Sequence, residues 1–265
     1  EMMTVKLFAD SASDLPKEFF KQDNIEFFPL KVHIEGQDYE DLISIEPKKV
    51  FDKIREGHMP KTSQVSPESF LKKFTEIAEK GEKGIYVAFS SQLSGTYQTA
   101  VMIRDQVKEE HPGLDLTIID SKCASLGYGL VVKSALTALN AGADHQEIID
   151  TINYQAEHME HLFTVEDLNH LAKGGRLSKA SAFLGGLLNI KPLLNVEEGK
   201  LVPIEKIRGK KRLLRRIVEV MRERGDSLDK QLIAISHANN EKSALEMKKM
   251  IQEEFGTKEI YINQI

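Results

Sequence analysis

Cysteine is nearly absent from this chain of 265 residues, because Cys123 is the only one. A single cysteine excludes an internal disulfide framework and leaves no second thiol for a metal or redox pair. Proteins without disulfides are typical of reducing compartments. We therefore expect a cytoplasmic location and no metal or redox role for Cys123.

Several other signals are also missing. No apolar run approaches the roughly 20 residues that a membrane-spanning helix needs, and the first residues lack the pattern of a signal peptide. The chain contains no G-x-x-x-x-G-K-[ST] phosphate loop and no H-E-x-x-H or Cys/His cluster. His158 and His161 lie three apart without a carboxylate as a third ligand, so we expect them on a helix surface. We expect no cofactor, no metal and no integral membrane segment.

Excess positive charge is missing as well, since the formal net charge is −5 at pH 7. Without a long basic stripe interleaved with aromatic residues, the sequence gives no reason to expect nucleic acid as a partner. The densest basic segment is RGKKRLLRR, residues 208–216. It fits the solvated face of an amphipathic helix, and it also fits a docking surface for an acidic partner.

Strand-like and helix-like segments alternate through residues 1–160, which predicts an α/β domain with a mainly parallel sheet flanked by helices. One strand is expected over residues 25–36, followed by a turn at Gly36 and Gln37. The helix over 67–81 should turn one apolar stripe inward. The other predicted strands cover 5–9, 84–89 and 115–120. The other predicted helices cover 13–21, 47–57, 95–111, 126–142 and 145–159. The stripe of the 67–81 helix consists of Phe70, Leu71, Phe74, Ile77 and Ala78.

Residues 161–265 have a different pattern, which predicts a smaller α+β domain closely packed against the first. A strand at 161–165 is followed by two extended stretches around the turn EEGK, which indicates a hairpin. Helices are predicted at 208–225 and 241–256, and strands at 231–240 and 259–263. The inward positions of the first of these helices are Leu213, Leu214, Ile217, Val218 and Met221.

The stretch FSSQLSGTYQTA, residues 89–100, leads from a buried strand through a polar turn into a helix. The first N–H groups of a helix lack partners and favour an anion. Ser94 could donate its hydroxyl to a bound oxygen, Gly95 would let a ligand approach the backbone, and Thr96 could cap or add a second hydroxyl. A plain helix cap explains the same residues. A nucleophilic serine is a third interpretation, but the G-x-S-x-G turn is absent.

A second hydroxyl-rich turn is KTSQVSPESF, residues 61–70. Ser66 and Pro67 begin a helix, so Thr62 and Ser63 are not needed for its cap. Polar residues are ordinary in a loop. Two such turns at the same ends of neighbouring strands would nevertheless form a ligand site, because ligands of α/β sheets bind beyond the carboxyl ends of strands.

Two further motifs have open interpretations. In FADSASDLP, the side chains of Asp10, Ser11 and Asp14 either cap a helix, with Ser13 or Asp14 as the cap, or support the ligand loops. In LAKGGRLS, Gly174 and Gly175 should end a helix, Arg176 should project from the corner, and Ser178 should start another helix. The following AFLGGLLNI is either a packed helix or the wall of an apolar tunnel, with space left by Gly185 and Gly186.

In their order along the chain, these motifs resemble the DegV family of bacterial fatty-acid-binding proteins. The resemblance rests on the motifs FADSASDLP, KTSQVSPESF, FSSQLSGTYQTA, IDSKCASLGYGLVV, LAKGGRLS, LLNIKPLL and ISHANN. It implies a two-domain α/β protein that holds one long-chain fatty acid in a buried tunnel and is not itself an enzyme. It also implies a partner, a separate ATP-dependent fatty-acid kinase, which receives the carboxylate and makes an acyl phosphate for phospholipid synthesis.

The resemblance also assigns residues. The family's carboxylate-binding threonine, serine and arginine match Thr62, Ser94 and Arg176, and Ser63, Gly95 and Thr96 belong to the same two turns. The stretch holding Lys206 and Arg208 looks like the family's kinase-docking segment. Family members usually end in a Gly-rich segment with a histidine near the carboxylate, so we expect the natural chain to continue past Ile265.

Two alternatives remain at this point. A stand-alone serine hydrolase or acyltransferase would use Ser94 as its nucleophile, and turnover of an activated ester would reveal it. A lipid-sensing regulator that binds DNA is the other alternative. The acidic charge and the lack of a helix-turn-helix pattern disfavour it. The shape of the tunnel, which packing decides, will set the length and saturation of the fatty acid.

Overall fold

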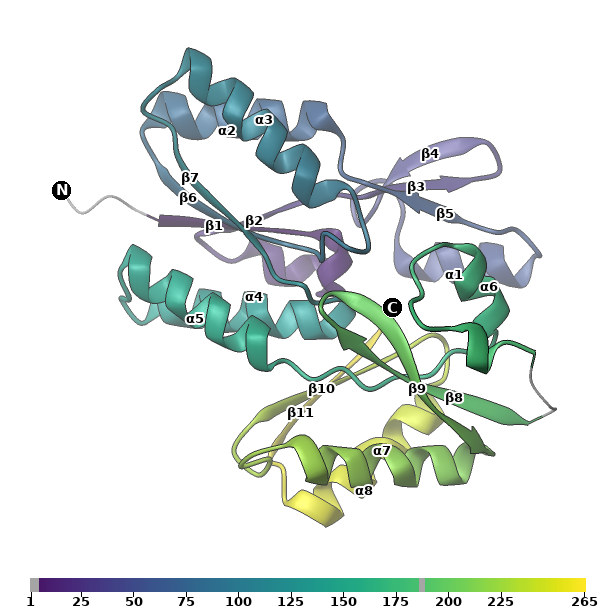
Figure 1. Cartoon of the computed structure of the whole chain (residues 1–265). Helices are drawn as coiled ribbons and strands as arrows, with labels where there is room; N and C mark the ends of the chain where they lie inside the picture. The colour runs from purple at the N-terminus through teal and green to yellow at the C-terminus, as the bar shows by residue number, and fades with distance from the viewer. Residues whose placement is uncertain (1–4, 186–188) are drawn as a thin grey trace. The chain divides into compact units, whose positions relative to one another are not determined.

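The structure is a computed structural model that describes residues 5–185 and 189–265. The chain divides into two compact units, Glu1–Met159 and Glu160–Ile265. The first unit contains a four-stranded parallel sheet, and the second contains a hairpin and a pair of parallel strands, each with helices (Figure 1). Among the described helices, none is long and apolar enough to cross a bilayer.

The parallel sheet of the first unit has the strand order β2-β1-β6-β7, and every pair is parallel. Helices α2 and α3 cover one face of the sheet, and α4 and α5 cover the other (Figure 1). A sheet covered on both faces needs nearly continuous apolar strands, which the sequence has. This confirms the predicted α/β class. The strands are β1 Val5–Asp10, β2 Ile25–Phe28, β6 Lys83–Ala88 and β7 Asp115–Asp120, and the helices are α2 Pro67–Lys80, α3 Thr96–Glu110, α4 Ser125–Asn140 and α5 His145–His158.

Aromatic rings fill the core between the sheet and α2. Phe28 contacts the rings of Phe70, Phe74 and Tyr86 at centroid distances of 4.7, 6.0 and 5.3 Å. Phe70 and Phe74 are spaced four residues apart on α2, so one helix face reaches the sheet. Leu71 is 41% exposed, and its predicted inward position was wrong because it lies at the edge of this stripe.

The single strand predicted over 25–36 is divided between two sheets: residues 25–28 form β2 of the parallel sheet, and residues 31–34 form the middle strand of a separate antiparallel sheet with the order β4-β3-β5. Pro29 ends the first half of that segment, since it has no N–H for a ladder. Glu35 and Gly36 have φ values of 52° and 74° and form the two-residue turn, so Gln37 already begins the next strand. The elements of this excursion are β3 Lys31–Ile34, β4 Gln37–Glu40, α1 Pro47–Arg55 and β5 Lys61–Ser63.

Two 3₁₀ turns, η1 Ser11–Ser13 and η2 Lys17–Lys21, stand where a helix over 13–21 was predicted. The cap is Asp10, whose Oδ1 accepts from Ala12 N at 3.0 Å, and neither Ser13 nor Asp14 has that role. Pro16 separates the turns, because it lacks an N–H and disfavours helical geometry in the residue before it.

The second unit has the predicted α+β character. Strands β8 and β9 form an antiparallel hairpin, and β10 pairs in parallel with β11. Leu193, Ile207, Leu213 and Val220 pack the helix α7 against the hairpin. Val220 was not among the predicted inward residues, whereas Leu213 and Val218 were, and both are buried. The elements are β8 Ile190–Glu197, β9 Lys200–Arg208, α7 Lys210–Arg224, β10 Leu232–His237, α8 Glu241–Phe255 and β11 Glu259–Gln264.

The part of the second unit that precedes β8 is less regular than predicted. The expected strand 161–165 amounts to one bridge between Phe163 and Leu194, and His161 lies beyond the end of α5 instead of on a helix. Helix α6 Leu168–Lys173 ends at Gly174 as predicted. Ser178 does not restart a helix, because its N–H bonds to Leu201 O at 2.9 Å and only η3 Ser181–Phe183 follows. Residues 186–188 of the predicted tunnel wall, which include Gly186, lie outside the described part.

Candidate anion-binding site

The loop Phe89–Gly95 connects β6 to α3 at the carboxyl edge of the parallel sheet. It is tightly folded on itself, since Leu93 N and Ser94 N both donate to Ser90 O, at 3.0 and 3.2 Å. Ser90 N in turn donates to Cys123 O at 3.1 Å, which ties the loop to the segment after β7. These bonds position Ser94 directly before the first turn of α3, where the sequence predicted it.

Ser94 and Thr96 form a small hydroxyl network. Ser94 Oγ accepts from Thr96 N at 3.2 Å, and the two hydroxyl oxygens lie 2.9 Å apart. The buried Thr96 Oγ1 also accepts from Val65 N at 3.3 Å. Thr96 can therefore donate its own hydrogen to Ser94 Oγ, and the hydroxyl hydrogen of Ser94 is then available to another acceptor.

Backbone donors lie next to that hydroxyl. Within the described part of the chain, the N–H groups of Gly95, Tyr97 and Gln98 have no hydrogen-bond acceptor, whereas Thr99 N already bonds to Gly95 O at 3.0 Å. Unpaired N–H groups at a helix start carry partial positive charge and attract anions. The arrangement can bind a carboxylate with one hydroxyl and several amides, all of them uncharged.

Thr62 lies on β5, paired with Val32 in the antiparallel sheet, and is exposed. The expectation of two turns at the ends of neighbouring parallel strands was therefore wrong. Ser63 is also engaged, because its hydroxyl lies 3.0 Å from His33 Nε2. The sequence could not show that Thr62 belongs to a second sheet, because the residues on either side of Pro29 were predicted to form one strand of the parallel sheet.

The residues after Thr62 nevertheless bring its segment to the start of α3. Gln64 Nε2 donates to Thr99 Oγ1 at 2.9 Å, alongside the bond from Val65 N to Thr96. Gly95 permits this approach, since a Cβ there would stand 2.3 Å from Gln64 Oε1. The structure thus gives Gly95 a packing reason that the sequence did not reveal, in addition to the predicted approach of a ligand.

The motif after β1 supports the same edge. Asp10 is fully buried, and its Oδ2 accepts from Tyr86 Oη at 2.6 Å and from Phe89 N at 3.3 Å. Burial among neutral donors raises the pKa of Asp10 to about 6. Ser11 Oγ accepts from Leu30 N at 2.9 Å, and the Asp14 carboxylate accepts from the Ser125 hydroxyl. Asp10 therefore serves as both a cap and a support for the loop.

Asp120 has a matching role that the sequence analysis missed. Its Oδ1 accepts from Ser91 N at 3.1 Å and from Lys122 N at 3.0 Å, and its Oδ2 accepts from the Ser91 hydroxyl. The only signal in the sequence was that Asp120 is the last residue of a predicted strand. The sequence does not show that this strand, β7, pairs with β6, the strand that leads into the Ser94 loop.

The serine-nucleophile alternative finds no support here. Among the described residues, Ser94 makes no hydrogen bond to a histidine, lysine or carboxylate that could take its proton. Cys123 is equally unsuited to nucleophilic chemistry, because burial raises the pKa of its thiol to about 12.

Arg176 belongs to the second unit and is exposed. It follows Gly175, whose φ of 73° is left-handed and favours glycine, so the corner after α6 is built as predicted. Its role toward a ligand stays a prediction.

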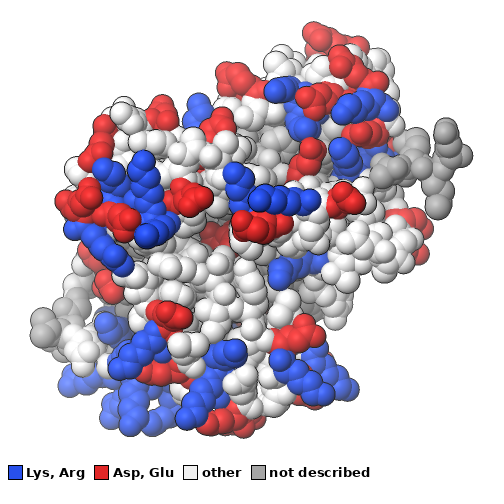
Figure 2. All heavy atoms as spheres, turned by 180° about the vertical axis from the view of Figure 1, so that it is seen from behind, with Lys and Arg blue, Asp and Glu red and all other residues white. Residues whose placement is uncertain are grey.

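Lys206 and Arg208 lie on the exposed side of β9, on either side of the buried Ile207. Lys206 Nζ stands 5.6 Å from the centre of the Phe183 ring. Within the basic segment, Arg216 is already paired, because it forms a bidentate bond to Glu205 at 2.7 to 3.0 Å. Basic and acidic side chains are intermixed over the face shown in Figure 2. From Lys210 onward the segment belongs to the amphipathic helix α7, and its outer cations remain candidates for docking.

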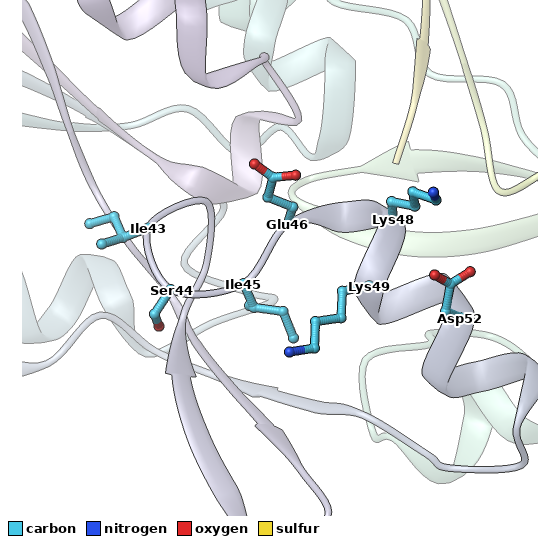
Figure 3. A pocket seen from close by; sticks show the side chains of 7 residues that line it. All are labelled: Ile43, Ser44, Ile45, Glu46, Lys48, Lys49 and Asp52. Carbon is cyan, nitrogen blue, oxygen red and sulfur yellow. The ribbon is translucent and has the colours of Figure 1, made fainter.

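Two other features of the first unit lie away from the predicted residues. A hollow of ≈ 360 Å³ is lined by the loop before α1 and its first turns, and none of the predicted site residues borders it (Figure 3). Separately, Glu35, Glu56 and His58 converge on one another, but the Lys53 ammonium contacts both carboxylates, at 3.1 and 3.5 Å. We interpret that cluster as an ion-pair network. The hollow is lined by Ile43, Ser44, Ile45, Glu46, Lys48, Lys49 and Asp52.

The fold and the loop together define a class of protein: an α/β unit and an α+β unit, the first with a loop of uncharged hydrogen-bond donors at the carboxyl edge of its parallel sheet. Residues 4–265 match the model of a family described as "Uncharacterised protein, DegV family". The chain therefore belongs to the DegV family, which confirms the resemblance of its motifs.

Similar proteins cover nearly the whole chain. A DegV domain-containing protein of Clostridium perfringens is 37% identical over 262 residues, which are 98% of this chain and 90% of that protein. The crystal structure of a DegV family protein from Ruminococcus gnavus, described with vaccenic acid, has a TM-score of 0.86 at 27% identity and covers 99% and 93% of the two chains. A DegV family protein from Thermus thermophilus, described by its fatty-acid binding, has a TM-score of 0.83 at 30% identity, with 99% and 92% covered.

Proposed function

We propose that this protein binds a long-chain fatty acid in a buried tunnel and presents the carboxylate to a separate ATP-dependent fatty-acid kinase. The observation that carries the proposal is the hydroxyl network in which Thr96 can donate to Ser94 and leave the hydrogen of Ser94 for a carboxylate. The fatty acids of the Ruminococcus and Thermus relatives support the same ligand class. In this proposal Thr62, Ser63, Ser94, Gly95, Thr96 and Arg176 bind the carboxylate.

The two units take different parts in this proposal. Residues 1–160 supply the carboxylate-binding loops, and residues 161–265 cover the acyl chain. Burial of about 15 methylenes at ~0.8 kcal/mol each offers roughly 12 kcal/mol before ordering costs are subtracted. The tail therefore supplies most of the affinity, and the head group needs only a few donors to fix its position.

Uncharged donors also suit the chemistry that follows. The carboxylate must attack the terminal phosphorus of ATP in the site of the kinase. Hydroxyl and amide donors orient the carboxylate with less effect on its nucleophilicity than a charged donor has, and Arg176 is the single charged group among the proposed carboxylate-binding residues. The protein itself then has no catalytic residue and works in the cytoplasm. The kinase supplies the nucleotide site, and Lys206 and Arg208 dock it.

Mass spectrometry of lipid extracted from the purified protein tests the proposal directly. We expect one long-chain fatty acid per chain, and binding of added fatty acid after delipidation. A protein that neither carries nor binds a fatty acid would overturn the proposal. The same preparation should not hydrolyse an activated ester, and turnover abolished by Ser94→Ala would instead establish the hydrolase.

A further inference from the structure

Two aspartates hold the Ser94 loop from opposite sides of its own strand. In the sheet order β2-β1-β6-β7, the strand β6 that leads into the loop lies between β1 and β7. Asp10 is the last residue of β1, and Asp120 is the last residue of β7 and pairs with Ala88 at the end of β6. The two carboxylates therefore stand on both sides of the point where the chain leaves the sheet.

Each carboxylate accepts a backbone N–H of the loop. Phe89 N donates to Asp10 Oδ2 at 3.3 Å, and Ser91 N donates to Asp120 Oδ1 at 3.1 Å, with a second bond from the Ser91 hydroxyl to Oδ2. Tyr86 Oη donates to the same Asp10 oxygen at 2.6 Å, which fixes the carboxylate that holds the loop.

The backbone of the loop start is also held from α4. Tyr128 Oη donates to Val87 O at 2.6 Å and accepts from Asp10 N at 2.9 Å, so one buried hydroxyl joins β1 to β6 just before the loop. Side chains locked by several bonds of this kind restrict the backbone that they contact.

A count of the loop N–H groups shows what the two aspartates accomplish. Their two bonds, together with the bonds to Cys123 O and to Ser90, give an acceptor to each N–H from residue 89 to residue 94. The first N–H without an acceptor in the described chain is that of Gly95, beside the Ser94 hydroxyl. The loop thus turns its early donors inward and leaves the later ones for a ligand.

From this geometry we infer that Asp10 and Asp120 are positioning residues for the fatty-acid carboxylate, acting through the loop without touching the ligand. The inference rests on the proposed function and deepens it. Asn in place of Asp10 keeps the shape but puts an amide N–H₂ against the N–H of Phe89 or of Ala12. At Asp120 an Asn could keep the bond from Ser91 N, because the Ser91 hydroxyl can also accept, so Ala is the informative replacement there and removes both acceptors. Loss of these acceptors should release backbone N–H groups at this edge and shift the donors around Ser94.

The test compares palmitic acid with methyl palmitate, which has the same tail and no carboxylate. Competition against a fluorescent fatty acid gives both affinities for the wild type, Asp10→Asn, Asp120→Ala and the matched control Asp105→Ala. Asp105 lies exposed on α3, where it pairs with Arg104 at 3.1 Å. We expect the preference for the acid to fall about tenfold in the first two variants, roughly one hydrogen bond to a charged group, while ester affinity and the control stay unchanged.

An NMR measurement of carboxyl-labelled palmitate supplies a second readout, since the bound carboxyl resonance reports its hydrogen bonds. It should move in Asp120→Ala and stay in Asp105→Ala. Should Asp10→Asn fail to fold, Asp120→Ala and Ser91→Ala decide the question.

The outcomes separate the two proposals. A wild type without preference for the acid overturns the proposed function. A wild type with that preference, unchanged in the folded aspartate variants, overturns the positioning role. Equal loss of acid and ester binding in a folded variant also overturns it, because it indicates general structural damage.

Discussion

The phenolic hydroxyl of Tyr86 donates to the carboxylate of Asp10 at 2.6 Å, and both side chains are fully buried. The pair links β6 to β1 directly below the loop that carries Ser94. A carboxylate with no access to water and only neutral donors is ionised at a cost, which makes this pair sensitive to pH.

Asp10→Asn should remove a pH dependence of stability. The pKa of Asp10 is raised from 3.8 to about 6, so the unfolded chain ionises before the folded one. The stability that the protonated group contributes is complete below about pH 4 and is lost as pH rises through 6. The shift corresponds to about 3 kcal/mol. We therefore expect urea unfolding between pH 4 and pH 7.5 to show that the free energy of unfolding of the wild type falls by about that amount relative to Asp10→Asn. If the difference between the two proteins is the same at every pH, Asp10 does not have the raised pKa.

Gly95→Ala should weaken both stability and fatty-acid binding. Its Cβ would stand 2.3 Å from Gln64 Oε1, so Gln64 must move and lose its bond to Thr99. We expect a loss of about 1 kcal/mol in the free energy of unfolding. The double variant Gly95→Ala with Gln64→Ala removes the clash. In urea unfolding, its loss of free energy of unfolding should therefore be smaller than the sum of the losses in the two single variants. Additive costs would mean that Gln64 is not the obstacle.

Thr96→Val should disconnect the hydroxyl network without changing the shape of the side chain. The buried Val65 N loses its acceptor, at a cost of about 1–3 kcal/mol, and Ser94 loses a donor. Thr96→Ser keeps the hydroxyl and serves as the control. Both the Tm and the preference for palmitic acid over methyl palmitate should be lower in Thr96→Val than in Thr96→Ser. Equal values in the two variants would argue against the network.

Ser94→Ala should affect phosphoryl transfer more than fatty-acid binding. The tail retains most of the affinity, so we expect at most about a tenfold loss of binding. A carboxylate that is no longer oriented should react about a hundredfold more slowly in the kinase. The measurements are fatty-acid titration and acyl-phosphate formation with saturating kinase. Equal losses in the two assays would count against an orienting role.

Charge reversal of Lys206 and Arg208 should weaken docking to the kinase. Both side chains are exposed on β9, so Lys206→Glu with Arg208→Glu leaves the core intact. We expect the KM for this protein in the kinase assay to rise about tenfold, with fatty-acid affinity unchanged and the wild-type interaction weakened by salt. Lys249→Glu on α8 is the control, and an equal effect there would indicate a nonspecific charge effect.

Local patterns predicted most elements of the fold. Ser66 and Pro67 begin α2 as the sequence indicated, with Ser66 Oγ accepting from Ser69 N at 3.2 Å. The predictions failed where a proline or a turn redirected the chain. Pro29 divides one apolar run between two sheets, and Pro16 divides an expected helix into two 3₁₀ turns.

The candidate site divides in the same way. Ser94 could be found from its sequence because a hydroxyl turn before a helix is a local feature. Asp120 could not, since its contact with Ser91 spans 29 residues and depends on β6 and β7 being neighbours. The approach of Gln64 to Gly95 was hidden for the same reason.

By itself, the sequence determined the alternation of strands and helices, the cap of α2, the family motifs and the absence of a second cysteine. These depend on residues within a few positions of one another, where hydrogen bonding and apolar periodicity act directly. Tertiary structure alone decided which strand ends meet, and hence that Asp10 and Asp120 hold one loop. Strand order follows from the packing of distant segments, which no local pattern contains.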